Sequence, residues 1–126
     1  MGYRSDLHLV ADEDTWAKFV LVLGAKHVTE LRSYADTFQV LTANNISYQH
    51  LEMSSIKWYP GYALVDAVNE AIEEVHDARD ARIPHGRGIG MVRVGEGDGN
   101  EPDIEEYGSP HEVGLYLSSP SINWEI

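Results

Sequence analysis

The stretch Ile56–Val75, with the sequence IKWYPGYALVDAVNEAIEEV, decides the fold that the rest of the chain completes. Pro60 has a fixed φ and no backbone N–H, so it suits the first turn of a helix and not a central strand. We therefore expect a strand to end near Tyr59 and a helix to begin there. Beyond this point apolar residues recur every three or four positions, which predicts an amphipathic helix.

The two faces of this helix differ in charge. Its apolar residues are Leu64, Val65, Val68, Ala71, Ile72 and Val75, and its acidic residues are Asp66, Glu70, Glu73, Glu74 and Asp77. Like charges spaced by four residues destabilise a helix by a few tenths of a kcal/mol each. Such a face either keeps a small protein soluble or meets a basic surface on another macromolecule.

The composition bounds the class of protein. The chain has 126 residues, which predicts a single domain spanning 1–126, and it has no cysteine. Disulfides, zinc–thiolate sites and cysteine nucleophiles are therefore excluded. The longest apolar run, Phe19–Leu23, is far shorter than the roughly 20 residues of a membrane span. We expect a soluble cytoplasmic protein that does not enter a membrane.

The net charge of −12 is concentrated in the second half of the chain. Residues 1–60 hold five basic and seven acidic side chains, whereas residues 61–126 hold four basic and 14 acidic ones. Direct binding to nucleic acid through phosphates needs a basic patch, and the sequence contains no run of basic residues. We expect a charged partner to be basic.

The N-terminal half predicts two helical pieces and three strands. Arg4–Ala11 alternates as a strand, and Asp12–Thr15 supplies capping residues for a helix that contains Trp16, Phe19, Val20 and Leu23. Gly24 is expected to end that helix in the left-handed conformation. A second helical piece is predicted within Lys26–Asp36, followed by a hairpin of Phe38–Thr42 and Ser47–Met53 around Asn44-Asn45.

The C-terminal half predicts a central strand and smaller elements. The amphipathic helix that begins near Tyr59 is expected to end around Arg79–Arg82, before a strand at Ile89–Val94. One helical turn is expected at Asp103–Tyr107. Two closing strands are expected at Val113–Leu117 and Ile122–Ile126. This order favours an α+β fold, an antiparallel sheet with two main helices packed on one face, ferredoxin-like or related.

No motif in the sequence identifies a catalytic residue, a metal ligand or a cofactor. Gly86, Gly88 and Gly90 precede a strand and do not open a helix, so they indicate close backbone approach or a flexible entry and not a phosphate loop. The acidic loop from Glu96 to Asp103 fails the spacing of a calcium-binding EF-hand. The six histidines are scattered: His8, His27, His50, His76, His85 and His111. Whether three of them converge in space is left open.

The aromatic junction Lys57, Trp58, Tyr59 and Tyr62 has two interpretations. Aromatic residues between a strand and a helix commonly pack the corner of a core. Aromatic and cationic side chains are also enriched at binding hot spots. A binding role for Trp58, Tyr59 and Tyr62 therefore stays open.

Three blocks of sequence resemble a family of small bacteriophage-encoded proteins. They are Gly2–Asp6 (GYRSD), Ile56–Tyr59 (IKWY) with Tyr62, and Val92–Glu96 (VRVGE) followed by Asp103–Glu106 (DIEE). The family pattern is a YRSDV start, a KWY centre and an R-[IV]-G-E…D-[IV]-E block. This chain departs from it at Leu7 and by an insert at Gly97–Pro102.

The resemblance implies a phage accessory protein that acts in the cytoplasm of an infected bacterium, and it assigns no catalytic residue. From the block pattern we expect one structural or binding cluster, which contains Arg4, Asp6, Lys57, Trp58, Arg93 and Glu96.

The first functional hypothesis is a non-catalytic protein that inhibits or redirects a host protein with a basic surface, such as a defence or nucleic-acid-handling protein. Its contact residues would be Asp66, Glu70, Glu73, Glu74, Asp77, Trp58, Tyr59 and Tyr62. The alternative is a small-molecule or nucleotide binder or hydrolase with a pocket near Trp58 and Arg93. A second alternative is a virion or assembly component that self-associates, as a dimer or larger, through an edge strand such as Val113–Leu117.

Overall fold

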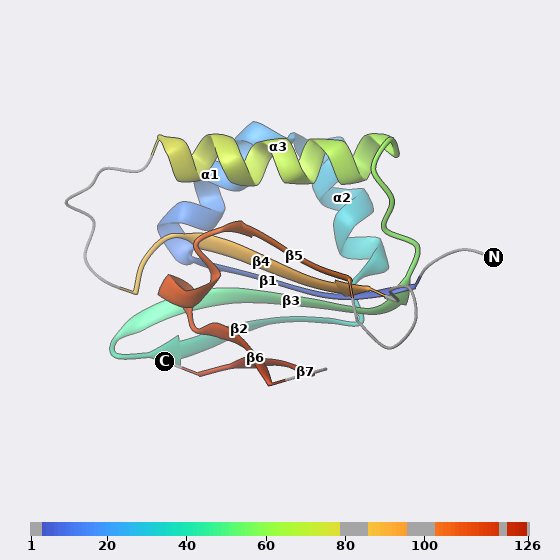
Figure 1. Cartoon of the computed structure of the whole chain (residues 1–126). Helices are drawn as coiled ribbons and strands as arrows, with labels where there is room; N and C mark the ends of the chain where they lie inside the picture. Colours follow the sequence, from blue (N-terminus) through green and yellow to red (C-terminus); the bar gives the residue numbers. More distant parts are fainter. Residues whose placement is uncertain (1–3, 79–85, 96–102, 119–120, 126) are drawn as a thin grey trace.

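The computed structural model describes residues 4–78, 86–95, 103–118 and 121–125, arranged in three layers (Figure 1). The elements are β1 (Ser5–Asp12), α1 (Glu13–Leu23), α2 (Ala25–Tyr34), β2 (Thr37–Ala43), β3 (Ile46–Ile56), α3 (Ala63–Asp77), β4 (Ile89–Gly95), β5 (Asp103–Gly108), the 3₁₀ helix η1 (Pro110–Val113), β6 (Leu115–Ser118) and β7 (Ser121–Trp124).

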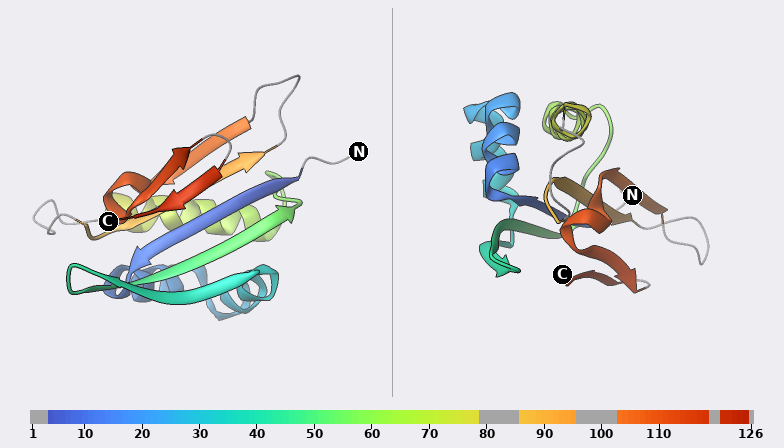
Figure 2. Two further views of the ribbon diagram at one scale, coloured as in Figure 1. Left: turned by 90° about the horizontal axis from the view of Figure 1, so that it is seen from below. Right: turned by 90° about the vertical axis from the view of Figure 1, so that its left-hand side faces the viewer.

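The main sheet has the strand order β2-β3-β1-β4-β5, and every neighbouring pair is antiparallel. The first four strands and the helices between them follow the ferredoxin-like β-α-β-β-α-β order, and β5 extends the sheet at one edge. The helices lie together on one side of the sheet (Figure 2). The predicted α+β fold is confirmed.

The first crossover is one helical segment broken at Gly24. Asp12 caps α1, because its carboxylate accepts a hydrogen bond from the backbone N–H of Thr15 at 3.3 Å. Gly24 has φ +91° and ψ 148°, and its N–H donates to the carbonyl of Val20. The expected left-handed cap is therefore replaced by a conformation that is essentially reserved for glycine. The predicted second helical piece is confirmed as α2.

The start of α3 differs from the prediction. The helix begins at Ala63, and Pro60 lies in a turn before it. Gly61 has φ +96°, which no helical residue adopts, so it separates Pro60 from the helix. The strand also ends earlier, at Ile56. All six residues of the predicted apolar face are buried. The predicted end at Arg79–Arg82 lies outside the described residues.

The hairpin of β2 and β3 forms as predicted, and the Asn44-Asn45 turn has φ values of 53° and 65°. By contrast, the helical turn predicted at Asp103–Tyr107 is wrong, because these residues form β5 and pair with β4. Pairing with a buried strand outweighs the helix propensity of a short acidic segment. The predicted strand at Ile89–Val94 is confirmed as β4, between β1 and β5.

The sheet is covered on both faces. On the helix side, Leu7, Leu9 and Met91 pack with the buried residues of α1 and α3. On the other side, Val10 and Val92 pack with η1 and with the separate β6–β7 hairpin, which lies beneath the sheet in Figure 1 and opposite the helices in Figure 2. The two C-terminal strands therefore form a third layer and do not close the main sheet.

Across the described residues, none of the helices combines the length and the apolar surface that a membrane-spanning segment requires.

Candidate functional site

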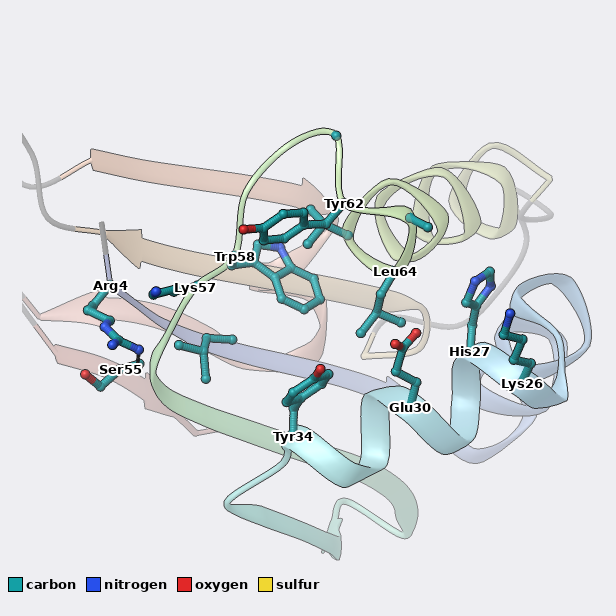
Figure 3. Close-up of a pocket in the computed structure, with 14 residues that line it drawn as sticks. Arg4, Lys26, His27, Glu30, Tyr34, Ser55, Lys57, Trp58, Tyr62 and Leu64 are labelled. Carbon is teal, nitrogen blue, oxygen red and sulfur yellow. Dashed lines mark hydrogen bonds between the residues drawn. The ribbon is translucent and has the colours of Figure 1, made fainter. Parts of the chain in front are cut away.

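A pocket of about 700 Å³ opens on the helix side of the sheet, between α2 and the segment that leads from β3 into α3. Figure 3 shows the side chains that line it. They are Arg4, Lys26, His27, Glu30, Tyr34, Ser55, Ile56, Lys57, Trp58, Tyr62, Ala63, Leu64 and Val65, together with Gly61. The aromatic junction of the sequence therefore forms one wall of a cavity.

The pocket has an aromatic floor and aromatic rims. Trp58 is 6 % exposed and belongs to the helix-side core, so the core-packing interpretation holds for its ring. Tyr34 and Tyr62 are 53 % and 52 % exposed at the entrance, one on α2 and one just before α3. Tyr59 packs its ring against Tyr62, with centroids 5.5 Å apart. An aromatic ligand would find rings on more than one side.

Basic side chains lie at both ends of this pocket. Arg4 and Lys57 lie at one end and Lys26 and His27 at the other, as Figure 3 shows, and the acidic residue on the wall is Glu30. Arg4 also donates to the carbonyl of Ser55 at 3.3 Å. Within the described residues, neither lysine takes part in an ion pair.

The start of α3 adds backbone donors to the pocket wall. Tyr62 is the N-cap residue and provides no side-chain hydrogen bond, and Ala63, Leu64 and Val65 line the cavity. Helix N-termini carry unpaired N–H groups and the positive end of the helix dipole. The carboxylate of Asp66 instead accepts the N–H of Gly61 at 3.0 Å, which holds the turn before the helix. The pocket therefore combines positive charge with apolar surface.

The cluster expected from the block pattern does not form as one group. Arg4, Lys57 and Trp58 line the pocket, and Arg93 lies apart from it. Arg4 and Asp6 both bond to the backbone of Ser55, a residue of β3 with φ 53°. Glu96 lies outside the described residues.

The buried side chain of Arg93 forms its own network on the helix side of β4. It donates to Ser5 at 3.0 Å, to Asp103 at 2.7 Å and to Glu105. Burial by itself would lower the pKa of Arg93, but the hydrogen bonds that it donates to both carboxylates outweigh burial and raise it. Burial, followed by the hydrogen bond that Tyr107 donates to Glu105, raises the pKa of Tyr107 to about 12. This network holds β5 against β4, so its role is structural.

The acidic face of α3 points away from the sheet. Asp66, Glu70, Glu74 and Asp77 are exposed, and Glu73 is half-buried because it accepts the N–H of Gly108 at 3.1 Å. No ion pair among the described residues includes a carboxylate of α3. Arg87 lies beside Asp12 and Asp14 and not beside this face.

Sequence reasoning missed one group of side chains on the opposite face of the sheet. His8, His50 and Glu52 place three potential metal-ligand atoms within 4.8 Å of one another. The alternation of His50 and Glu52 along one strand was a signal in the sequence. The pairing of that strand with β1, which brings in His8, was not readable from the sequence.

No protein-family model, curated protein or solved structure matches this chain. Its function is therefore inferred from its own side chains.

Proposed function

We propose that this protein acts by binding, and that the pocket beside Trp58 binds a small anionic ligand with an aromatic part. The observation that carries this proposal is the position of the cations. The whole chain has nine Lys and Arg residues against 21 Asp and Glu, yet Arg4, Lys26 and Lys57 line one pocket together with aromatic side chains. An acidic protein that gathers cations around a concave apolar surface favours anions there.

The dimensions and the charges of the pocket suit a nucleotide-like ligand. A volume of about 700 Å³ falls within the roughly 300–1,000 Å³ of small-molecule sites. A base has a face that can stack on Tyr34 or Tyr62, and a phosphate can reach Lys57 and Arg4 or the start of α3. Nucleoside monophosphates and diphosphates are therefore the first compounds to test.

The proposal is tested by isothermal titration calorimetry and thermal unfolding with these nucleotides and with aromatic carboxylates. A ligand at 100 times its Kd raises the unfolding free energy by about 2.7 kcal/mol. Lys57→Glu and Lys26→Glu should each weaken binding at least tenfold, because each reverses a charge at the pocket wall. Lys18→Glu is the matched control, because Lys18 is exposed on α1 and does not line this pocket.

Equal affinities in the three charge-reversal variants would refute a role for the pocket. Failure of the whole panel to stabilise the wild-type chain would refute the ligand class.

A second candidate function is favoured by the acidic face of α3, which is largely exposed and forms no ion pair among the described residues. We propose that this face contacts a basic surface on a host protein, in line with the resemblance to phage accessory proteins. Carboxylates without nearby counter-ions attract a basic partner at long range, so the association should be fast at low salt and weaken steeply as salt rises.

The test is affinity capture from infected host lysate at low and at high salt. Glu70→Lys should reduce capture of the partner, whereas Glu106→Lys, an identical charge change on β5, should leave it unchanged. Capture that is insensitive to salt, or equal loss in both variants, would refute this contact. Recovery of copies of this chain alone would favour the assembly role.

A further inference from the structure

The pairing of β1 with β3 brings two histidines and a glutamate together on the face opposite the pocket. His8 lies directly across from Glu52, and Val10 lies across from His50. Side chains alternate between the faces of a strand, and Val10 and Tyr48 belong to the core beneath the hairpin. His8, His50 and Glu52 therefore point to the hairpin side, where the ring of Trp124 lies 6.2 Å from that of His50.

The three donor atoms are spaced as ligands of one metal ion are spaced. His8 Nδ1 lies 3.0 Å from His50 Nε2, and Glu52 Oε1 lies 3.7 Å from the first nitrogen and 3.5 Å from the second. Ligand atoms about 2.0–2.1 Å from a tetrahedral Zn²⁺ are about 3.3 Å apart. Small side-chain rotations would bring all three atoms to this separation.

The two imidazoles are largely buried beside carboxylates. Burial lowers the pKa of His50 to about 4, with a further contribution from His8, and burial lowers the pKa of His8 against the attraction of Glu52 and Asp6. Metal ions bind the neutral form of an imidazole. The carboxylates of Glu52 and Asp6 add negative charge beside them.

We propose that His8, His50 and Glu52 form a binding site for a divalent transition-metal ion, with Zn²⁺ as the reference ion. Two imidazoles and one carboxylate suit Zn²⁺ and similar borderline ions, whereas Mg²⁺ and Ca²⁺ prefer oxygen ligands alone. The side chain of His50 is 4 % exposed and that of Glu52 is 33 % exposed. The ion would thus be held from the protein side, and three protein ligands leave a fourth position for water.

The surroundings of His50 set an expectation for the affinity. Coordination through Nε2 places the ring proton on Nδ1, and this atom is buried without a hydrogen-bond partner among the described residues. A missing outer-shell acceptor typically costs about 10–100-fold in affinity. We therefore expect tighter binding than at isolated surface histidines but weaker binding than at a zinc site with a complete outer shell.

The experiment uses the untagged full chain, freed of metal with a chelator and titrated with ZnCl₂ by calorimetry. One Zn²⁺ should bind per chain and raise Tm. CoCl₂ should give the visible absorption of low-symmetry Co²⁺ bound through nitrogen, and it should quench Trp124, whose ring lies close to His50.

Glu52→Gln and His8→Gln should each weaken Zn²⁺ binding at least tenfold and abolish the Co²⁺ absorption. His111→Gln is the matched control, because His111 is exposed on η1 and does not belong to this cluster. Tm values measured without metal identify any variant that fails to fold. If one of the two substitutions, Glu52→Gln or His8→Gln, prevents folding, the other still tests the site. The absence of Zn²⁺ binding to the wild-type chain, or equal affinity in ligand and control variants, would overturn the site.

The metal site is independent of the proposed function. It lies across the sheet from the pocket, so Lys57→Glu should leave the affinity for Zn²⁺ unchanged.

Discussion

At the scale of single residues, Gly90 explains how η1 can press against the sheet. A Cβ atom added to Gly90 would lie 2.3 Å from the Cα of Pro110, closer than any real contact. Ser109 donates its N–H to the carbonyl of Ile89 at 2.8 Å, which holds the two segments at this distance. The sequence-based interpretation of the glycines as a place of close backbone approach therefore holds at Gly90.

Gly90→Ala should destabilise the protein by about 1–3 kcal/mol or more, because overpacking between two backbones has no flexible side chain to absorb it. Urea unfolding followed by circular dichroism measures the loss. An unchanged midpoint would show that η1 can withdraw from β4 without cost.

The raised pKa of Tyr107 predicts that the protein loses stability at high pH. Burial, followed by the hydrogen bond to Glu105, raises the pKa of Tyr107 to about 12, above its ordinary value of 10.0. The folded state therefore keeps the proton when the unfolded state releases it. The stabilisation is complete below pH 10 and disappears as the pH rises towards 12.

Ionisation of Tyr107 should lower the free energy of unfolding by at most about 2 kcal/mol, since the side chain is partly exposed. Urea unfolding between pH 9 and pH 11.5 measures it. Tyr107→Phe, which cannot ionise, should show a smaller decline over this range. Parallel declines in both proteins would contradict the assignment to Tyr107.

At the scale of secondary-structure elements, α3 combines a fully buried apolar face with an exposed face on which carboxylates repel one another. Its apolar residues are all buried, and burying a large aliphatic side chain contributes about 1.5–3 kcal/mol. Along the exposed side, Asp66, Glu70 and Glu74 follow one another at four-residue spacing. Each such repulsion costs only a few tenths of a kcal/mol. Burial of the apolar residues therefore outweighs the repulsion between the carboxylates, and the helix forms despite that repulsion.

Glu70→Lys should stabilise the isolated protein by about 0.5–1 kcal/mol, because it replaces two repulsive pairs with two attractive ones. Thermal unfolding at low salt measures the gain, and high salt should reduce it. If the same variant also fails to bind the proposed host partner, the acidic face is kept for binding at a cost in stability. A variant that is less stable than the wild type would contradict the electrostatic account.

At the scale of the whole molecule, the β6–β7 hairpin turns a two-layer fold into a three-layer one. Leu115 is 1 % exposed, and Trp124 donates its indole N–H to the carbonyl of Val113 at 2.7 Å. Together they cover Val10, Tyr48 and other apolar residues on the second face of the sheet. The hairpin also bounds the side of the sheet on which His50 lies.

A chain that ends at Gly114 should be destabilised by several kcal/mol and should self-associate, because its sheet would expose a contiguous apolar face. Analytical ultracentrifugation and thermal unfolding test this together. The substitution Tyr116→Ala, at an exposed position of the same hairpin, is the control and should change neither quantity by much. A truncated chain that remains monomeric with the wild-type Tm would show that the third layer is dispensable.

Much of this architecture was readable from the sequence. The apolar period of α3, the capping residue Asp12 and the Asn44-Asn45 turn all act over a few residues, so their local pattern is sufficient to predict them. The error at β5 has the opposite origin. Its acidic residues resemble a helical turn locally, but Arg93 and the edge of β4 hold them in a strand.

By itself, the sequence determined the α+β class, the main helices and the concentration of acidic charge on α3, because periodicity and composition are local properties. Only the tertiary structure decided that cations gather around Trp58 and that His8 meets His50. Those two histidines are 42 residues apart in the chain, and no local pattern encodes their encounter. It depends on strand order and register, which are set by the packing of the whole sheet.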